Sequence, residues 1–493
     1  MATTPTVVLL PVWGAGHLTP MLEAGSRLLA CRGDHVLSLT VLVMPPPSQQ
    51  QAAEVDAHLL REEAAAAAGH GHAIRFVRLP AVDPPTDHQG PVEFVSRVVR
   101  LHLPHVRSAL SGLGCRVAAI LLDLFCTEML DVARDLAIPS YIYFTCNAAA
   151  LSFFLRLPSL CAEVDGEFAA MDGAVDLPGL PPVPSSALPV IVMDRTKPCC
   201  DWYAYHGRRF TDANGGVVVN TAADLEPRAL AAVAAGRCCA PGVPPPKLYP
   251  VGPIISFDSS PSPPPGDECV RWLDAQPAGS VVFLCFGSGG YFTAAQAHAA
   301  ARGLERSGHR FLWVLRGPPA APGDRRPTDG DLDELLPDGF LDRTKHRGLV
   351  WPTTAPQKAV LAHAAVGGFV THCGWNSVLE ALWHGVPMAA WPRYAEQHLN
   401  AFALVADVGA AVAMEVDRDR DNFVEAAELE RAVRALVGGE DEEGRKAREK
   451  AKEMMAVCRR AVEDGGSSAA ALKRLCDDIV FNSKCTVEVK QSS

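Results

Sequence analysis

Short runs of apolar, β-branched residues alternate along the chain with longer segments whose apolar residues recur every three or four positions. The first pattern predicts buried strands, and the second predicts helices that cover them. Because parallel strands need a crossover connection, usually a helix, this order predicts parallel sheets with helices on both faces. The strands are expected at residues 6–12, 35–43, 117–125, 140–145, 216–221, 280–287, 310–317, 348–352, 366–372 and 387–392.

The alternation stops between Ser256 and Glu268, where proline, serine and glycine replace the apolar pattern. This composition is typical of a linker, and 493 residues exceed the usual size of one domain. We therefore expect an α/β protein with two doubly wound, Rossmann-like lobes facing across a cleft, with ligand loops at the carboxyl ends of the strands. The expected bounds are an N-terminal domain at 1–255, the linker at 256–268, a C-terminal domain at 269–464, and a final helix and tail at 465–493.

Three other segments have distinct compositions. Residues 318–334 are polar and rich in proline, which predicts a mobile surface loop. Residues 440–464 predict a charged surface helix with ion pairs four residues apart, and 469–481 predict a last amphipathic helix.

Composition and charge exclude several classes of protein. A formal charge of −11 argues against nucleic-acid binding, which needs basic surfaces. The 15 cysteines are scattered without CxxC spacing, which favours free thiols in a reducing compartment. The N-terminus lacks a basic signal region, and no window approaches the roughly 20 apolar residues of a membrane helix. We expect a soluble, cytoplasmic monomer.

The first candidate for chemistry is the stretch "PVWGAGHLTP", where a glycine loop follows the first strand. His17 would lie at the start of a helix, either as a general base or as a residue that caps the helix. Asp123, at the end of a strand at the same sheet edge, could orient the imidazole or could simply cap the strand end. The stretch has GxG without a third glycine, and no acid follows the second strand, so a dinucleotide fingerprint is weak.

The second candidate is the turn after the strand at 366–372. Gly374 precedes a predicted helix, and free N–H groups at a helix N-terminus form a phosphate site. The side chains of His372, Asn376 and Ser377 could add hydrogen bonds to phosphate oxygens. Ser377 and Glu380 also fit a capping box, S-x-x-E, which would exist without any ligand.

The segment from Thr354 to Gln397, with "HCGWNS", "HGVP", "WP" and a terminal "EQ", resembles the signature box of plant family 1 UDP-dependent glycosyltransferases. "GHLTP", "LDAQP", "FGS" and "GGSS" extend the resemblance over nearly the whole chain. The resemblance implies the GT-B fold, with the last helix packing back on the N-terminal lobe. It also implies a UDP-sugar donor, a small aromatic acceptor such as a flavonoid or other phenolic, and no metal or other cofactor.

The resemblance also implies a role for individual residues of the box. Gln397 at the end of the box favours UDP-glucose as donor. Thr354 occupies the position where the family usually has a tryptophan that stacks on the uracil, which should weaken donor binding. The implied contacts are Ala355 and Gln357 to the uracil and ribose; Glu380 to the ribose hydroxyls; His372, Asn376, Ser377 and Ser288 to the diphosphate; and Trp375, Glu396, Gln397 and Thr145 to the sugar.

These observations lead to one expected reaction and three alternatives. We expect an inverting transfer of glucose to a phenolic hydroxyl, with His17 as base and Asp123 stabilising the imidazolium. The alternatives are a nicotinamide-dependent oxidoreductase, a non-catalytic nucleotide-sugar-binding protein, and a metal-dependent transferase that uses "DRDRD" at 417–421. Trp13, Phe125 and Phe144 would give an aromatic acceptor cleft or would pack in the core.

Overall fold

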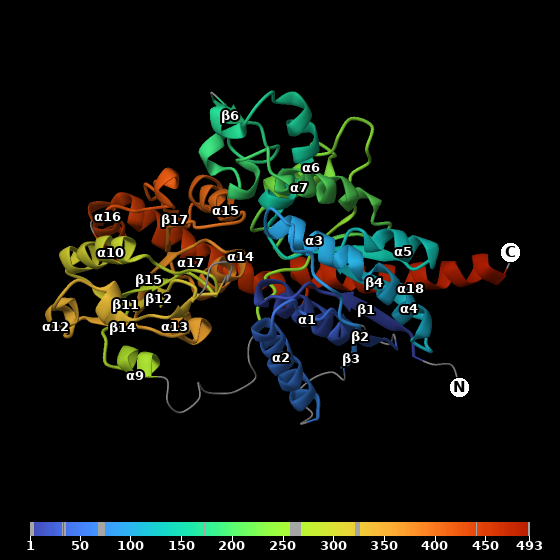
Figure 1. The fold of residues 1–493 in the computed structure, drawn as a ribbon, viewed down its shortest axis with the longest axis horizontal. Helices are drawn as coiled ribbons and strands as arrows, with labels where there is room; N and C mark the ends of the chain where they lie inside the picture. The colour runs from blue at the N-terminus through green and yellow to red at the C-terminus, as the bar shows by residue number, and fades with distance from the viewer. Residues whose placement is uncertain are drawn as a thin grey trace. The chain divides into compact units, whose positions relative to one another are not determined.

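The computed structural model describes residues 4–31, 33, 36–67, 74–171, 173–256, 268–320, 326–439 and 441–491. The chain divides into two compact units (Figure 1). The first unit comprises Met1–Ser185, Ile191–Ser259 and Arg460–Ser493, and the second comprises Ser186–Val190 and Ser260–Arg459. Each unit is built around its own parallel sheet.

The sheet of the first unit has the strand order β3-β2-β1-β4-β5-β8-β9, and every neighbouring pair is parallel. Its central strands are buried apart from the first residue of β4, as expected for a sheet covered on both faces. The strands are β1 (Thr6–Leu10), β2 (Ser38–Val43), β3 (Ile74–Arg78), β4 (Val117–Asp123), β5 (Ser140–Phe144), β8 (Gly216–Val219) and β9 (Leu248–Pro250), with β6 (Ala174–Val175) and β7 (Val183–Pro184) forming a small antiparallel pair.

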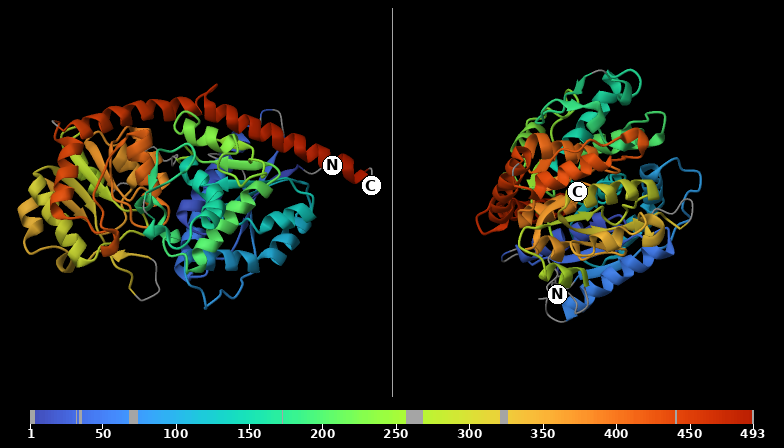
Figure 2. Two further views of the ribbon diagram at one scale, coloured as in Figure 1. Left: turned by 90° about the horizontal axis from the view of Figure 1, so that it is seen from above. Right: turned by 90° about the vertical axis from the view of Figure 1, so that its left-hand side faces the viewer.

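Helices of the first unit bury their apolar stripes against this sheet. Apolar residues of α1 and α18 join those of β1, β2 and β4 in one core cluster. The last helix contacts β4, β9 and α1, and Figure 2 shows it as the long red helix leading to the C-terminus. The helices are α1 (Ala15–Ala30), α2 (Gln49–Ala67), α3 (Pro91–Leu101), α4 (Leu103–Gly112), α5 (Met129–Asp135), α6 (Ala148–Glu163), α7 (Pro198–Arg209), α8 (Pro227–Ala234) and α18 (Ser467–Gln491).

The sheet of the second unit has the order β14-β11-β10-β15-β16-β17, again with parallel pairs throughout. The order places the ends of β14, β10, β15 and β16 along one sheet edge, which is where a doubly wound sheet binds ligands. The strands are β10 (Val281–Cys285), β11 (Arg310–Val314), β14 (Gly348–Trp351), β15 (Val366–Thr371), β16 (Met388–Ala390) and β17 (Ala411–Val412), and β12 (Arg316–Gly317) pairs with β13 (Thr328–Asp329).

Helices α10 and α16 of the second unit pack against each other, and α16 packs on β10, β15 and β16. Their buried residues form one core cluster with Phe311, Trp313 and Trp391. The helices are α9 (Glu268–Asp274), α10 (Ala294–Ser307), α11 (Leu332–Leu335), α12 (Phe340–Thr344), α13 (Gln357–Ala362), α14 (Trp375–His384), α15 (Gln397–Ala403), α16 (Ala426–Val437) and α17 (Glu442–Val462). Shorter turns of helix are 3-10 at Phe168–Ala170, Ser185–Ala187, Val190–Val192, Phe210–Asp212 and Arg418–Arg420, and π at Leu404–Val408.

The α/β class with two parallel sheets is confirmed, and each strand expected from the apolar runs is present. The pattern did not predict β3, β9 or β17, which are edge strands of two to five residues. The expected loop at 318–334 is wrong in its described part, because β13 pairs with β12 and α11 follows. The expected linker lies outside the described residues except at its ends.

No helix in the described parts of the chain is long and apolar enough to cross a membrane.

Candidate active site

The first cluster of candidate side chains lies at the ends of β1 and β4, which are neighbours in the sheet of the first unit. His17, in the first turn of α1, places its Nδ1 atom 2.8 Å from Oδ2 of Asp123. The Asp123 carboxylate is fully buried, and its Oδ1 accepts the backbone N–H of Phe125 at 3.0 Å. A carboxylate accepts hydrogen bonds, so Nδ1 of His17 carries the proton and the lone pair lies on Nε2. This is the tautomer that a general base needs.

The alternative role of His17 as a helix cap is wrong. Helix α1 begins at Ala15, the residue before it is Gly14, and no side chain accepts from the first backbone N–H groups. Gly14 has φ 118°, which residues with a Cβ rarely adopt, so glycine is required for the chain to turn from β1 into the helix. Asp123 also caps the end of its strand, because its Oδ1 accepts the backbone N–H of the following turn.

Aromatic side chains surround His17 on one side. The ring of Phe125 lies 5.7 Å from the His17 ring and 6.1 Å from that of Tyr203. Phe144, in contrast, is fully buried against Phe154 and Phe210, so its role is core packing. Trp13 is partly buried and packs against the core of the first unit.

Helix α7 contributes residues that the sequence analysis did not identify. Tyr203 stacks on Phe154 with ring centroids 4.4 Å apart, and His206 contacts Phe125 at 5.5 Å. His206 is fully buried between the hydroxyls of Ser96 and Thr127, at 2.8 and 2.7 Å. Burial lowers the pKa of His206 to about 3, so this imidazole is neutral and connects α3 and α7 to the loop after β4. In the sequence, the aromatic cluster "DWYAYH" could have pointed to Tyr203 and His206.

The second cluster lies at the ends of four strands of the second unit. After β15 the chain turns at Cys373, a buried residue with φ 63°. The Cys373 carbonyl accepts a hydrogen bond from Nδ2 of Asn400 at 3.0 Å, and its N–H donates to Oγ1 of Thr371 at 3.3 Å. These bonds hold a conformation that costs a non-glycine residue about 1 to 2 kcal/mol. The turn leads directly into Gly374 and α14.

His372 is packed between two glycines from different strand ends. A Cβ on Gly287 would lie 2.6 Å from Nε2 of His372, and one on Gly374 would lie 2.5 Å from it. Burial lowers the pKa of His372 to about 4, so the side chain is neutral. Its Nδ1 atom is buried and has no hydrogen-bond partner in the described structure. A polar ligand group at this point would satisfy it.

Gln357 connects α13 to α14. Its Nε2 atom donates to Oε2 of Glu380 at 2.7 Å and to Oγ of Ser377 at 2.9 Å. The capping-box alternative for Ser377 and Glu380 is therefore wrong, because α14 begins two residues earlier, at Trp375, and no side chain caps it. Burial raises the pKa of the Glu380 carboxyl. The structure thus brings together three of the side chains expected at the nucleotide.

The loop between β14 and α13 carries Thr354 and Ala355. The strand ends at Trp351, whose Nε1 donates to the Thr354 carbonyl at 3.2 Å. Thr354 itself is exposed, and Ala355 is half-buried and accepts the N–H of Gln357 at 2.9 Å. The indole of Trp351 is therefore hydrogen-bonded to the backbone of its own loop.

The remaining predicted side chains surround the same edge of the second unit, except Thr145. Gln397 is buried, and its Oε1 accepts the backbone N–H groups of Arg393 and Tyr394, each at 3.0 Å. Tyr394, which the sequence analysis did not single out, is 40% exposed and has its ring 6.3 Å from that of His372. Trp375 is buried, Asn376 is half-buried, Glu396 precedes α15, Ser288 is exposed in the turn after β10, and Thr145 is buried at the end of β5 in the first unit.

The "DRDRD" run forms a closed surface turn. Oδ1 of Asp417 accepts the N–H groups of Asp419 and Arg420, and the Arg420 guanidinium donates to Glu425 at 2.8 Å. Within the residues that the structure describes, no group of three or more His, Cys, Asp or Glu side chains could hold a metal ion.

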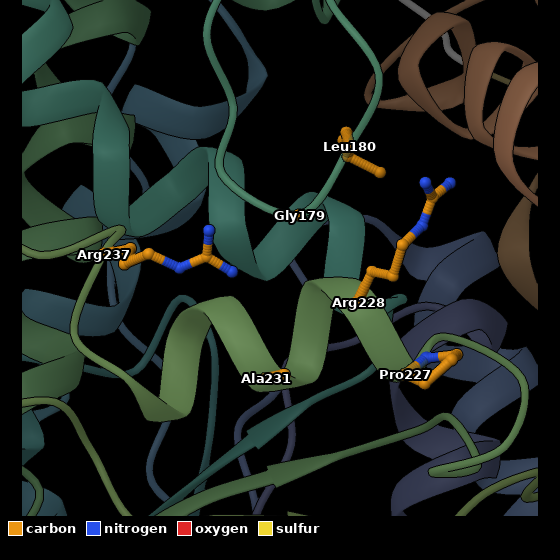
Figure 3. Close-up of a pocket in the computed structure, with 6 residues that line it drawn as sticks. All are labelled: Gly179, Leu180, Pro227, Arg228, Ala231 and Arg237. Atoms are coloured by element: carbon orange, nitrogen blue, oxygen red, sulfur yellow. The ribbon is translucent and has the colours of Figure 1, made fainter.

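A pocket of about 410 Å³ lies elsewhere in the first unit, beside α8. Figure 3 shows the side chains of Arg228 and Arg237 on either side of Gly179. A Cβ on Gly179 would lie 2.6 Å from the Arg228 carbonyl, so this glycine allows the loop to approach the helix. The pocket is lined by none of the predicted site residues.

Known proteins resemble this chain over nearly its whole length. A family model described as "UDP-glucoronosyl and UDP-glucosyl transferase" matches residues 242–446. A rice protein (Oryza sativa subsp. japonica) named malvidin galactosylase UGT88C3 is 59% identical, over 97% of this chain and 98% of its own. The anthocyanidin 5,3-O-glucosyltransferase of a Rosa hybrid cultivar is 39% identical, over 95% and 98%. The solved structure of Phytolacca americana UGT2 with UDP-2fluoro-glucose and pterostilbene has a TM-score of 0.80 at 35% identity, covering 96% of this chain and 99% of that one.

Proposed function

The chain belongs to the plant family 1 UDP-glycosyltransferases and has their GT-B fold, and from that premise we propose that it transfers glucose from UDP-glucose to a hydroxyl of a flavonoid or related phenolic. The observation that carries the proposed chemistry is the contact of 2.8 Å between His17 and the buried Asp123 carboxylate. An oxidoreductase or a non-catalytic binding protein has no support from these relatives.

The proposed reaction is one direct displacement. Nε2 of His17 removes the proton from the acceptor hydroxyl, and Asp123 stabilises the imidazolium that forms. The acceptor oxygen attacks the anomeric carbon, the bond to UDP breaks, and the configuration at that carbon is inverted. The partly exposed ring of Phe125 beside His17 provides an apolar surface for a flat phenolic acceptor, and the buried ring of Tyr203 packs against it.

The second unit supplies the proposed donor site. Glu380 and Gln357 would bind the ribose, with Gln357 also beside the uracil, and His372 would lie beside the diphosphate. The N-terminus of α14 at Gly374 directs backbone N–H groups and the positive end of the helix dipole toward this sheet edge. This electrostatic stabilisation of the departing UDP acts without a metal ion.

The donor sugar is the least constrained part of the proposal. Gln397, at the end of the signature box, favours glucose, and its amide is held in place by two backbone N–H groups. The rice relative is named a galactosylase and the rose relative a glucosyltransferase. UDP-galactose is therefore the competing donor to test.

A matrix of UDP-sugars against anthocyanidins, other flavonoids and stilbenes, with products identified by mass, tests the proposal. We expect a single hexose to be added to a phenolic oxygen, with UDP-glucose as the preferred donor and with equal rates in EDTA. Loss of activity in EDTA that Mn²⁺ restores would contradict the metal-free mechanism. Faster turnover with UDP-galactose would reassign the donor, and absence of any transfer across the matrix would contradict the proposed activity.

The exposed position of Thr354 leads to a separate prediction. Changing Thr354→Trp should lower the KM for the UDP-sugar about fivefold or more, since an aromatic ring stacked on a base contributes about 1 to 3 kcal/mol. Steady-state kinetics at saturating acceptor measure this. Thr353→Trp, which adds the same ring one residue earlier, is the matched control and should leave the KM unchanged. If Thr354→Trp leaves the KM unchanged or raises it, another group already replaces the missing stack.

A further inference from the structure

Two cysteines from adjacent helices face each other in the first unit. Cys161 lies near the end of α6, Cys200 lies near the start of α7, and their Sγ atoms are 3.9 Å apart. Helices α6 and α7 pack against each other. Cys161 is partly exposed, whereas Cys200 is buried, and both are free thiols in this structure. An oxidant from solvent can therefore approach Cys161, and the Cys200 sulfur lies within contact distance of the Cys161 sulfur.

The charges around the pair make the two thiols unequal. The hydrogen bond with Cys200 and the guanidinium of Arg195 lower the pKa of the Cys161 thiol. Arg195 is fixed beside this cysteine, because its Nη2 donates to the Cys161 carbonyl at 2.8 Å. The same hydrogen bond, together with burial, raises the pKa of Cys200. A partly exposed thiol beside an arginine, with a second thiol 3.9 Å away, is the arrangement of a reactive cysteine and its resolving partner.

We propose that Cys161 and Cys200 are a peroxide-sensitive modification site, at which oxidation forms a disulfide between α6 and α7. The Cys161 thiolate attacks one oxygen of hydrogen peroxide, the O–O bond breaks, and hydroxide leaves. Cys161 then carries a sulfenic acid. The Cys200 sulfur then attacks the Cys161 sulfur, and the S–O bond breaks. In total two thiols and one peroxide give one disulfide and two waters, and a dithiol reductant reverses the modification.

Closing this bond links the two helices that carry part of the aromatic cluster. The S–S bond is about 2.05 Å long, so the sulfurs must approach by about 1.9 Å from their present separation of 3.9 Å. The same two helices carry the stacked rings of Phe154 and Tyr203, 4.4 Å apart. Tyr203 in turn contacts Phe125, the neighbour of His17. Oxidation should therefore distort the proposed acceptor surface and raise the KM for the acceptor.

The experiment treats the full-length protein with hydrogen peroxide, blocks remaining thiols, and maps disulfides by mass spectrometry without reduction. We expect a peptide pair joined through Cys161, and its loss on treatment with a dithiol. The tryptic peptide that contains Cys200 also contains Cys199, so variants must assign the partner. Cys161→Ser and Cys200→Ala should each abolish the cross-link. Cys199→Ala is the matched control, because that residue is equally buried and adjacent, and it should keep the cross-link.

Activity provides a second, separate measurement. Peroxide should raise the acceptor KM severalfold in the unmodified protein and in Cys199→Ala, reversibly, and should leave Cys161→Ser unaffected. Peptide mapping that finds Cys161 unmodified, or oxidised only to sulfinic acid, would overturn the proposal whatever the enzymatic activity. A cross-link that leaves the acceptor KM unchanged would overturn the effect on the acceptor surface. Since mapping needs no substrate, failure of the proposed transferase activity would not be confused with failure of this site.

Discussion

Replacing His17 by alanine should lower kcat about 10²- to 10⁴-fold, the usual contribution of a positioned general base. The variant removes Nε2 of His17, the atom proposed to take the proton from the hydroxyl of the sugar acceptor, since Nδ1 is hydrogen-bonded to Asp123. Asp123→Asn should also lower kcat strongly, because an amide in place of the buried carboxylate no longer stabilises the imidazolium. Initial rates at saturating donor and acceptor measure both effects.

The control for these variants is donor binding, since the proposed donor side chains belong to the second unit. The rise in melting temperature caused by UDP should be the same in His17→Ala as in the unmodified protein. If His17→Ala retains most of the turnover, the assignment of the base is wrong. If it loses the response to UDP as well, the variant has damaged the fold, and the comparison must use His17→Gln, which preserves more of the side-chain volume.

Glu380→Ala should raise the KM for the UDP-sugar about 10- to 150-fold, since a hydrogen bond to a charged group contributes about 1.5 to 3 kcal/mol. The change also leaves the Gln357 amide without its bond of 2.7 Å to Glu380. Kinetics with varied donor, supported by calorimetric binding of UDP, measure the loss. Glu449→Gln, on the exposed face of α17, is the control and should leave the donor KM unchanged.

The raised pKa of Glu380 adds a pH dependence whose direction follows from the role proposed for it. The ionised carboxylate accepts hydrogen bonds from the ribose hydroxyls, so the donor KM should rise as the pH falls through that raised pKa. This loss begins at a higher pH than for an ordinary glutamate. Glu380→Gln should remove this pH dependence while weakening donor binding at neutral pH. A donor KM that is equally pH-dependent in Glu380→Gln would show that another group titrates.

Most strands at the ligand edges could be predicted because they are largely buried parallel strands, and such strands appear in the sequence as uninterrupted apolar runs. The same pattern failed for β3, which has no fully buried residue and whose sequence includes two arginines, and for β9, which has three residues. The pairing of β12 with β13 depends on contacts between segments that are polar and rich in proline. Edge strands of this kind are determined by their neighbours and not by their own composition.

Sequence reasoning placed His17 and Asp123 together because it needed only the adjacency of two strand ends. It could not choose between a capping box and a ligand role for Ser377 and Glu380, because that choice depends on where α14 begins. It also could not find Tyr203 and His206, which reach Phe125 from a helix far along the chain. A contact between side chains of distant elements has no local signature.

The packing of His372 between Gly287 and Gly374 has a consequence for efforts to redesign the enzyme. A Cβ on Gly287 or Gly374 would lie 2.6 or 2.5 Å from Nε2 of His372, so a substitution at either glycine would force the imidazole to move. Sequence diversity aimed at tighter UDP binding belongs instead at the neighbouring positions that have room, such as the exposed Ser288 and Thr354. Gly287, His372 and Gly374 are therefore positions to keep unchanged in mutagenesis, and the exposed residues beside them are the positions to vary.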